Sequence, residues 1–268
     1  MRITSLFLII SLFFSCKDTK KSELPKSIEK VAEVSEKVQY PEVLQKVFEA
    51  HGGLKNWKSE QTLSYEMPSE NGVSEKQVID LYTRKDKIVN GTVEMGFDGT
   101  NVWLLDADKS YKGDPVFYHN LMFYFYAMPF VLADNGIIYG ETEPLVFEGK
   151  TYPGISISYN PGVGVSYKDE YYLHYDPETY QMAWLGYTVS YRSGEKSDNV
   201  KWIRYNDWMK VNNVVLPKSI TWYAYEGKTI KEPKNTVQFE NIVLSNSAMV
   251  KGFYNVPENA VIVQGKQQ

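Results

Sequence analysis

The feature that most constrains the fold is a long series of short strand-like runs separated by turn residues, beginning near residue 62. The clearest turn is Asp98-Gly99, which stands between Phe97 and the run Val102-Trp103-Leu104. Asp-Gly favours the tight turn of a β-hairpin. Strands joined by short turns pair antiparallel, so the sequence predicts a mainly β protein built as an antiparallel meander. Besides the hairpin at residues 97–104, the expected strands are Thr62–Met67, Gln77–Arg84, Lys87–Met95, Leu145–Phe147, Gly154–Tyr159, Glu170–Tyr175, Met182–Ser190, Val200–Met209, Val214–Ala224 and Thr236–Leu244.

The composition agrees with a sheet-rich protein that has a sizeable core. Hydrophobic residues make up 43% of the 268 residues, and aromatic residues make up 15%, with 21 Tyr. Aromatic side chains fit a pleated surface well. The net charge of −4 gives no support to nucleic-acid binding, which usually needs a basic patch. A single cysteine excludes an intramolecular disulfide, and with three histidines it argues against a Cys/His zinc site.

The start of the chain has the pattern of an export signal. Met1-Arg2 is a short positive region, and the apolar run from Ile3 to Phe14 suits a signal-peptide core but is too short to span a bilayer. The run ends in Ser15-Cys16, which resembles the bacterial lipobox, although Phe13 stands where Leu is usual. The resemblance implies that Cys16 is lipidated. The alternatives are an incidental or buried cysteine and an ordinary secretory signal.

This pattern divides the chain into three expected parts. Residues 1–15 form a lipoprotein signal peptide, residues 16–39 form a charged, flexible tether, and residues 40–268 form a single β-rich domain. Two or more acyl chains anchor a protein stably to a membrane. We therefore expect a lipid-anchored protein of the cell envelope, at the outer membrane, with the leaflet left open.

Two segments read as helical. Pro41 to Ala50 carries Val43, Leu44, Val47 and Phe48 at helical spacing and ends at Gly52-Gly53. Val116 to Asn135 is apolar on nearly all sides, and we expect two short helices that meet near Met128-Pro129. A membrane span is the alternative for this second segment.

A family resemblance rests on two motifs. They are Ala50-His51-Gly52-Gly53-Leu54 at the helix end and the hairpin from Phe97 to Asp106. With the apolar helical insertion, this order resembles the LolA/LolB-like outer-membrane lipoprotein-sorting fold, and especially uncharacterised Bacteroidetes lipoproteins with a related domain. The resemblance covers roughly Pro41 to Val263. It implies a curved, incomplete antiparallel barrel with helices at its open side and an apolar concave face that takes acyl chains.

The leading hypothesis for function is that the apolar segment caps a cavity for a hydrophobic ligand, which would be a lipid or a lipoprotein. Aromatic and Met side chains adapt well to apolar ligands, but they also fill ordinary cores, and that interpretation stays open. No catalytic residue, cofactor or metal is expected. The candidate ligand-binding residues are Phe123, Phe125, Met128, Phe130, Val131 and Leu132.

Two other classes of function remain as alternatives. Carboxylates are plentiful enough for a glycan-acting hydrolase, although most of them suit turns, and His119 is the histidine most suited to a ligand site. The candidate carboxylates are Asp98, Asp106, Asp108, Asp114, Asp169 and Glu170. A partner-binding lipoprotein would instead present aromatic residues outward, because Tyr and Trp are enriched in interfaces. The orientation of Trp184, Trp202, Trp208 and Trp222 discriminates between ligand binding and partner binding.

Overall fold

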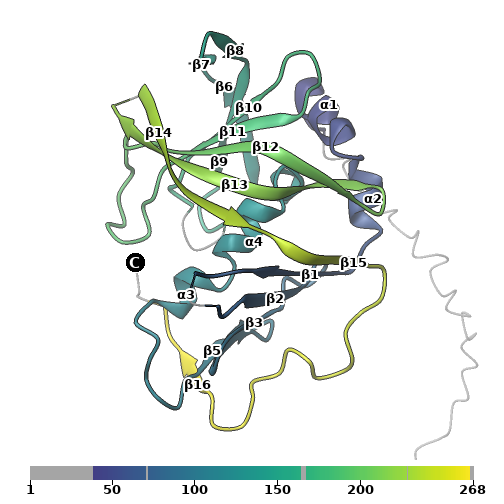
Figure 1. Ribbon diagram of the computed structural model, residues 1–268, viewed down its shortest axis with the longest axis vertical. Helices are drawn as coiled ribbons and strands as arrows, with labels where there is room; N and C mark the ends of the chain where they lie inside the picture. Colours follow the sequence, from purple (N-terminus) through teal and green to yellow (C-terminus); the bar gives the residue numbers. More distant parts are fainter. Residues whose placement is uncertain (1–38, 71, 164–166, 228, 266–268) are drawn as a thin grey trace, which may run out of the picture. The chain divides into compact units, whose positions relative to one another are not determined.

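Two antiparallel sheets of seven strands each form most of the structure (Figure 1). The computed structural model describes residues 39–268, apart from residues 71, 164–166, 228 and 266–268. The expected signal peptide, Cys16 and nearly all of the expected tether lie outside the described residues. The first sheet has the order β15-β1-β2-β3-β4-β5-β16, and the second has the order β14-β13-β12-β11-β10-β9-β6.

The strands have the following bounds. In the first sheet they are β1 (Thr62–Met67), β2 (Glu75–Asp80), β3 (Asp86–Asn90), β4 (Val93–Phe97), β5 (Val102–Leu105), β15 (Glu240–Ser245) and β16 (Val261–Val263). In the second they are β6 (Ile137–Glu141), β9 (Gly154–Tyr159), β10 (Tyr171–Tyr175), β11 (Met182–Tyr187), β12 (Lys201–Val211), β13 (Val214–Glu226) and β14 (Thr229–Gln238). A separate hairpin pairs β7 (Leu145–Phe147) with β8 (Lys150–Tyr152).

The two sheets are joined at one edge through Phe239. This residue alone separates β14, an edge strand of the second sheet, from β15, an edge strand of the first. Its ring is buried and packs against Tyr65 and Tyr126, with ring centroids 5.4 and 4.4 Å away. At the other end of the series, the edge strands β16 and β6 do not pair. The described residues therefore form an incomplete antiparallel barrel, as the sequence predicted.

The N-terminal helices close part of the core. Helix α1 (Glu42–Ala50) buries Leu44, Val47 and Phe48 along one face, as its spacing predicts. Helix α2 (Leu54–Lys58) follows and buries Trp57, whose ring stacks on Phe130 with centroids 4.8 Å apart.

The central apolar segment is divided into three short pieces, where two helices were expected. They are α3 (Pro115–Tyr118), α4 (Leu121–Tyr126) and the 3₁₀ helix η1 (Phe130–Ala133). The Asp114 side chain starts α3 by accepting hydrogen bonds from the backbone N–H groups of the next turn, at 3.0 and 3.4 Å. Figure 1 shows α3 and α4 between the two sheets. Within the described part of the chain, no helix is long and apolar enough to cross a membrane.

Seven of the expected strands have other limits in the structure, and three of them differ in a way that has a clear structural cause. The run Lys87–Met95 is a hairpin, because the chain turns after Asn90 at Gly91 and returns as β4. The run Thr236–Leu244 is broken at Phe239, where the chain passes between sheets. Strand β2 ends at Asp80, because its carboxylate accepts hydrogen bonds from the next backbone N–H groups and closes a turn. The short strands β6, β8 and β16 were not expected.

The tryptophans singled out in the sequence do not form an outward cluster. Trp184 and Trp202 are buried in a small second core beneath the β7–β8 hairpin, where Phe147 contacts the Trp184 ring at 4.7 Å. Trp208 and Trp222 pack against the main core.

Candidate functional site

All six candidate ligand-binding residues lie in the main core. None has more than 3% of its surface exposed. The Phe125 ring, for example, is packed between Tyr187 and Trp222, with centroids 5.0 and 5.6 Å away. Phe123 also borders a hollow of about 60 Å³, and Phe130 borders one of about 370 Å³. A ligand-binding role for the six stays a prediction.

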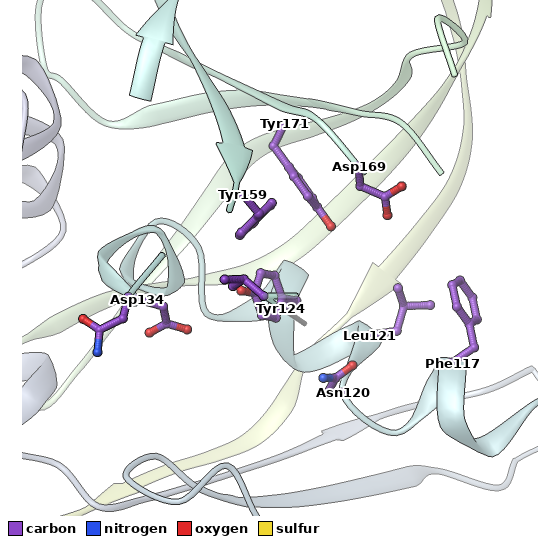
Figure 2. Close-up of a pocket in the computed structure, with 10 residues that line it drawn as sticks. Phe117, Asn120, Leu121, Tyr124, Asp134, Tyr159, Asp169 and Tyr171 are labelled. Carbon is purple, nitrogen blue, oxygen red and sulfur yellow. The ribbon is translucent and has the colours of Figure 1, made fainter. Parts of the chain in front are cut away.

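A cavity of about 290 Å³ lies beside them, on the other face of the same segment. It is bounded by α3 and α4 on one side and by the ends of β9 and β10 on the other (Figure 2). Its lining residues are Phe117, Asn120, Leu121, Tyr124, Asp134, Asn135, Tyr159, Val163, Asp169 and Tyr171. The lining is thus mostly aromatic and aliphatic, with polar groups at a few points, which is typical of small-molecule sites.

The helical side of the cavity follows from helical periodicity. Phe117, Leu121 and Tyr124 are separated by four and three residues, so they lie along one line across α3 and α4. Their neighbours Met122 and Phe125 project to the other side and are buried in the core. The spacing was visible in the sequence, but both faces of the segment are apolar. Periodicity alone therefore did not reveal which face meets a cavity.

The sheet side of the cavity is formed by two tyrosines from neighbouring strands. Tyr159 ends β9, and Tyr171 begins β10. Their rings meet edge to face, with centroids 5.8 Å apart. Burial raises the pKa of both phenols well above the usual value, so both hydroxyls stay protonated. The Tyr159 hydroxyl is buried beside the Tyr124 hydroxyl, with which it interacts through a side-chain hydrogen bond.

Two carboxylates complete the lining, and their surroundings differ. Asp134 is paired with Arg84, with 2.5 Å between Oδ1 and Nη2, and the guanidinium lies over the Phe123 ring at 5.0 Å. Asp169 is only 7% exposed and accepts a hydrogen bond from the backbone N–H of Ser190. Burial raises the pKa of both carboxyl groups.

The ion pair marks the border between this cavity and a second hollow of about 370 Å³. Asp134 and Asn135 line both spaces, and Arg84 lines the second. The second hollow lies against α2, and its apolar lining includes Trp57 and Phe130.

The remaining candidate carboxylates hold turns or helix ends. Asp98 accepts hydrogen bonds from the backbone of Thr100 and Asn101, and Asp106 does the same for Ser110 and Tyr111. Asp114 caps α3. Two further carboxylates are at the surface or beside it: Asp108 is exposed, and Glu170 pairs with Lys196 at 2.9 Å.

The histidines are bonded within the fold. His51 and His174 are buried against backbone groups, and His119 bonds through Nδ1 to Asp86 at 2.7 Å. None of the three lines the cavity. Among the described residues, no group of three or more His, Cys, Asp or Glu side chains could hold a metal ion.

Comparison with solved structures finds similar arrangements at very low sequence identity. A DUF1329 family protein from Desulfovibrio piger is 10% identical, with 75% of this chain and 92% of that chain covered and a TM-score of 0.48. A LolA superfamily protein from Nitrosomonas europaea is 7% identical, with coverage of 79% and 95% and a TM-score of 0.46. An outer membrane lipoprotein-sorting protein domain from Vibrio parahaemolyticus is 8% identical, with coverage of 78% and 97% and a TM-score of 0.40.

Sequence comparison gives the family. No curated protein matches this chain. The model of a family of unknown function, DUF6503, matches residues 3–237. Since this match covers most of the chain, the protein belongs to the DUF6503 family.

Proposed function

We propose that this protein binds a hydrophobic ligand, such as the acyl chain of a lipid or lipoprotein, in the cavity between α3–α4 and β9–β10. The observation that carries the proposal is the cavity itself, with aromatic and aliphatic side chains around about 290 Å³ of space. Burying apolar surface there would supply the affinity, at roughly 25 cal/mol per Å².

The proposal places the protein in the cell envelope, anchored at the outer membrane by lipid on Cys16, with the leaflet left open. The support is the sequence: an apolar run, a small residue and the single cysteine stand in the order of a lipobox. A lipid anchor would keep the cavity close to its source of acyl chains. If the ligand is the acyl chain of another lipoprotein, the protein would act in lipoprotein handling.

Ligand binding is favoured over the two alternatives by the positions of the candidate residues. The four tryptophans pack into the two cores, so they offer no outward aromatic patch for a partner protein. Three of the six carboxylates named for a hydrolase, Asp98, Asp106 and Asp114, hold turns or a helix end. We therefore interpret the cavity as a binding site.

The test changes the cavity wall with little effect on the core. Leu121 is half-buried and lines the cavity, so Leu121→Asn should weaken binding of a fluorescent monoacylglycerol by roughly tenfold while the melting temperature changes little. Val146 is 65% exposed on β7 and lies outside the cavity lining, so Val146→Asn is the matched control. Equal affinity in Leu121→Asn and in the unchanged protein would contradict the proposal.

A further inference from the structure

The same cavity combines aromatic rings with a buried carboxylate, Asp169, that forms no ion pair within the part of the chain that the structure describes. Phe117, Tyr124, Tyr159 and Tyr171 all contribute rings to its lining. Figure 2 shows the side chains of Tyr159 and Tyr171 reaching into the space above α4, opposite Tyr124. The faces of aromatic rings are electron-rich and attract cations, and cages of such rings are used to recognise ammonium groups. This wall therefore suits a positively charged group as well as an alkyl chain.

Asp169 lies beside these rings, and its carboxylate has acceptor sites that no hydrogen bond of the described residues uses. Its hydrogen bonds come from Ser190, and it forms no ion pair within the described residues. Lys201 attracts the carboxylate electrostatically without forming an ion pair with it. A carboxylate offers about four lone-pair sites, and a buried charge without a partner costs free energy. A cation that entered the cavity would supply the missing partner.

The other lining groups would not favour an anion. Asp134 and Asp169 are the charged residues of the described lining, and both are acidic. Arg84, which lines the neighbouring hollow, is already paired with Asp134. Asn120 and Asn135 are neutral. An anionic head group would therefore meet negative charge without a free counter-charge in this wall.

We propose that the ligand of this cavity is an amphiphile whose head carries an ammonium group, seated among the tyrosine rings beside Asp169. The alkyl chain packs against Leu121, Phe117 and Val163. This inference rests on the proposed function, because it names the charge class of the ligand for the same site. It also gives a role to Asp169, which the hydrogen bonds of the fold leave only partly used.

A series of amphiphiles with one chain length and three charges tests the inference without any change in the cavity. The full chain with Cys16→Ser is titrated calorimetrically with dodecyltrimethylammonium, monododecanoylglycerol and dodecanoate, each below its micelle concentration. The replacement removes any attached acyl chain that would compete. The trimethylammonium compound should bind at least about tenfold more tightly than dodecanoate, with the neutral glyceride between them.

A single substitution then assigns the preference to Asp169. Asp169→Asn keeps the size and an acceptor oxygen but removes the charge. It should lower the affinity for the cationic amphiphile about tenfold more than the affinity for the neutral one. Asp108→Asn removes an equal charge from an exposed position outside the cavity and serves as the control.

The outcomes separate this inference from the function on which it rests. If dodecanoate binds as tightly as the cation, or if Asp169→Asn and Asp108→Asn behave alike, the ammonium site is wrong and the hydrophobic cavity stands. If none of the three amphiphiles binds, the proposed function itself fails. If a thermal melt shows that Asp169→Asn does not fold, the affinities of the three amphiphiles for the protein with an unchanged cavity decide whether the ammonium site exists.

Discussion

His51 connects the end of α1 to the second sheet through both ring nitrogens. Its Nδ1 lies 3.2 Å from the carbonyl oxygen of Val215, and its Nε2 accepts the backbone N–H of Met182 at 3.0 Å. These partners require a neutral ring with its proton on Nδ1. Burial lowers the pKa of His51 from 6.5 to about 4. The sequence placed a histidine at this helix end, but its two partners come from β11 and from β13, which only the folded chain brings near.

The shift of the His51 pKa predicts a loss of stability in mild acid. The unfolded chain takes up a proton near pH 6.5, whereas the folded chain does so only near pH 4. The contribution of the neutral His51 ring to the free energy of unfolding is therefore fully present above about pH 6.5. It is lost as the pH drops from there to about 4, by about 3 kcal/mol for this group. Burial also lowers the pKa of His174 to about 4, so it adds to the loss in the same range.

Urea unfolding at pH 7 and at pH 4.5 measures this effect. His51→Gln should be less stable than the unchanged protein at pH 7, because the paired backbone groups lose their fitted partner. It should lose less of its remaining stability on acidification. If the variant and the unchanged protein lose the same free energy of unfolding between the two pH values, His51 is not the titrating group.

At the scale of elements, the turn after α1 depends on two adjacent glycines with different surroundings. Both have positive φ, +95° at Gly52 and +87° at Gly53. A Cβ on Gly52 would lie 2.1 Å from the backbone oxygen of Asn213, whereas a Cβ on Gly53 would have no neighbour within 4 Å. Gly52 thus permits a close approach between this turn and the β12–β13 connection, and Gly53 supplies conformational freedom alone.

The different surroundings of Gly52 and Gly53 predict that an alanine substitution lowers the free energy of unfolding more at Gly52 than at Gly53. Gly53→Ala should destabilise the protein by about 1–3 kcal/mol through backbone strain alone. Gly52→Ala carries a similar strain and should cost at least about 2 kcal/mol more, because backbone atoms must move apart. Thermal and urea unfolding of the two variants side by side measure the difference. Equal costs would mean that the approach to Asn213 is not a constraint.

Most elements could be predicted from the sequence where local chemistry decides them. Helix α1 follows from its apolar spacing, β1, β7 and β9 have the expected bounds, and the hairpin at Asp98 forms as its turn chemistry predicts. The missed break at Phe239 has no local signal, because it depends on the packing of that ring between two sheets.

The candidate site was predicted less well, for a physical reason. The sequence pointed to the segment that borders the cavity but named its core-facing residues, since a segment that is apolar on all sides does not show which face meets a cavity. Asp169 was named in the sequence only among the candidate carboxylates of a hydrolase. Its place beside Tyr159 and Tyr171 depends on strands that pair across the sheet, which spacing along the chain does not encode.

The whole molecule combines an open barrel with a side cavity, and we propose that a lipid anchor at Cys16 holds it at a membrane. Two sheets bent at Phe239 enclose the central helical segment, whose outer line of residues faces the cavity. The barrel stays open because its two end strands, β6 and β16, do not pair. The central claim is that the cavity holds an amphiphile, while a second, covalent lipid is attached at Cys16.

Native and denaturing mass spectrometry of the protein purified from its own envelope test this claim most directly. The account predicts two added masses: one that disappears on denaturation, from a lipid in the cavity, and one that remains, from acyl groups on Cys16. The mass lost on denaturation should yield an amphiphile with an ammonium group on extraction, and Leu121→Asn should reduce it. A native mass equal to the denatured mass, with no uptake of added amphiphile, would contradict the claim that the cavity is a binding site.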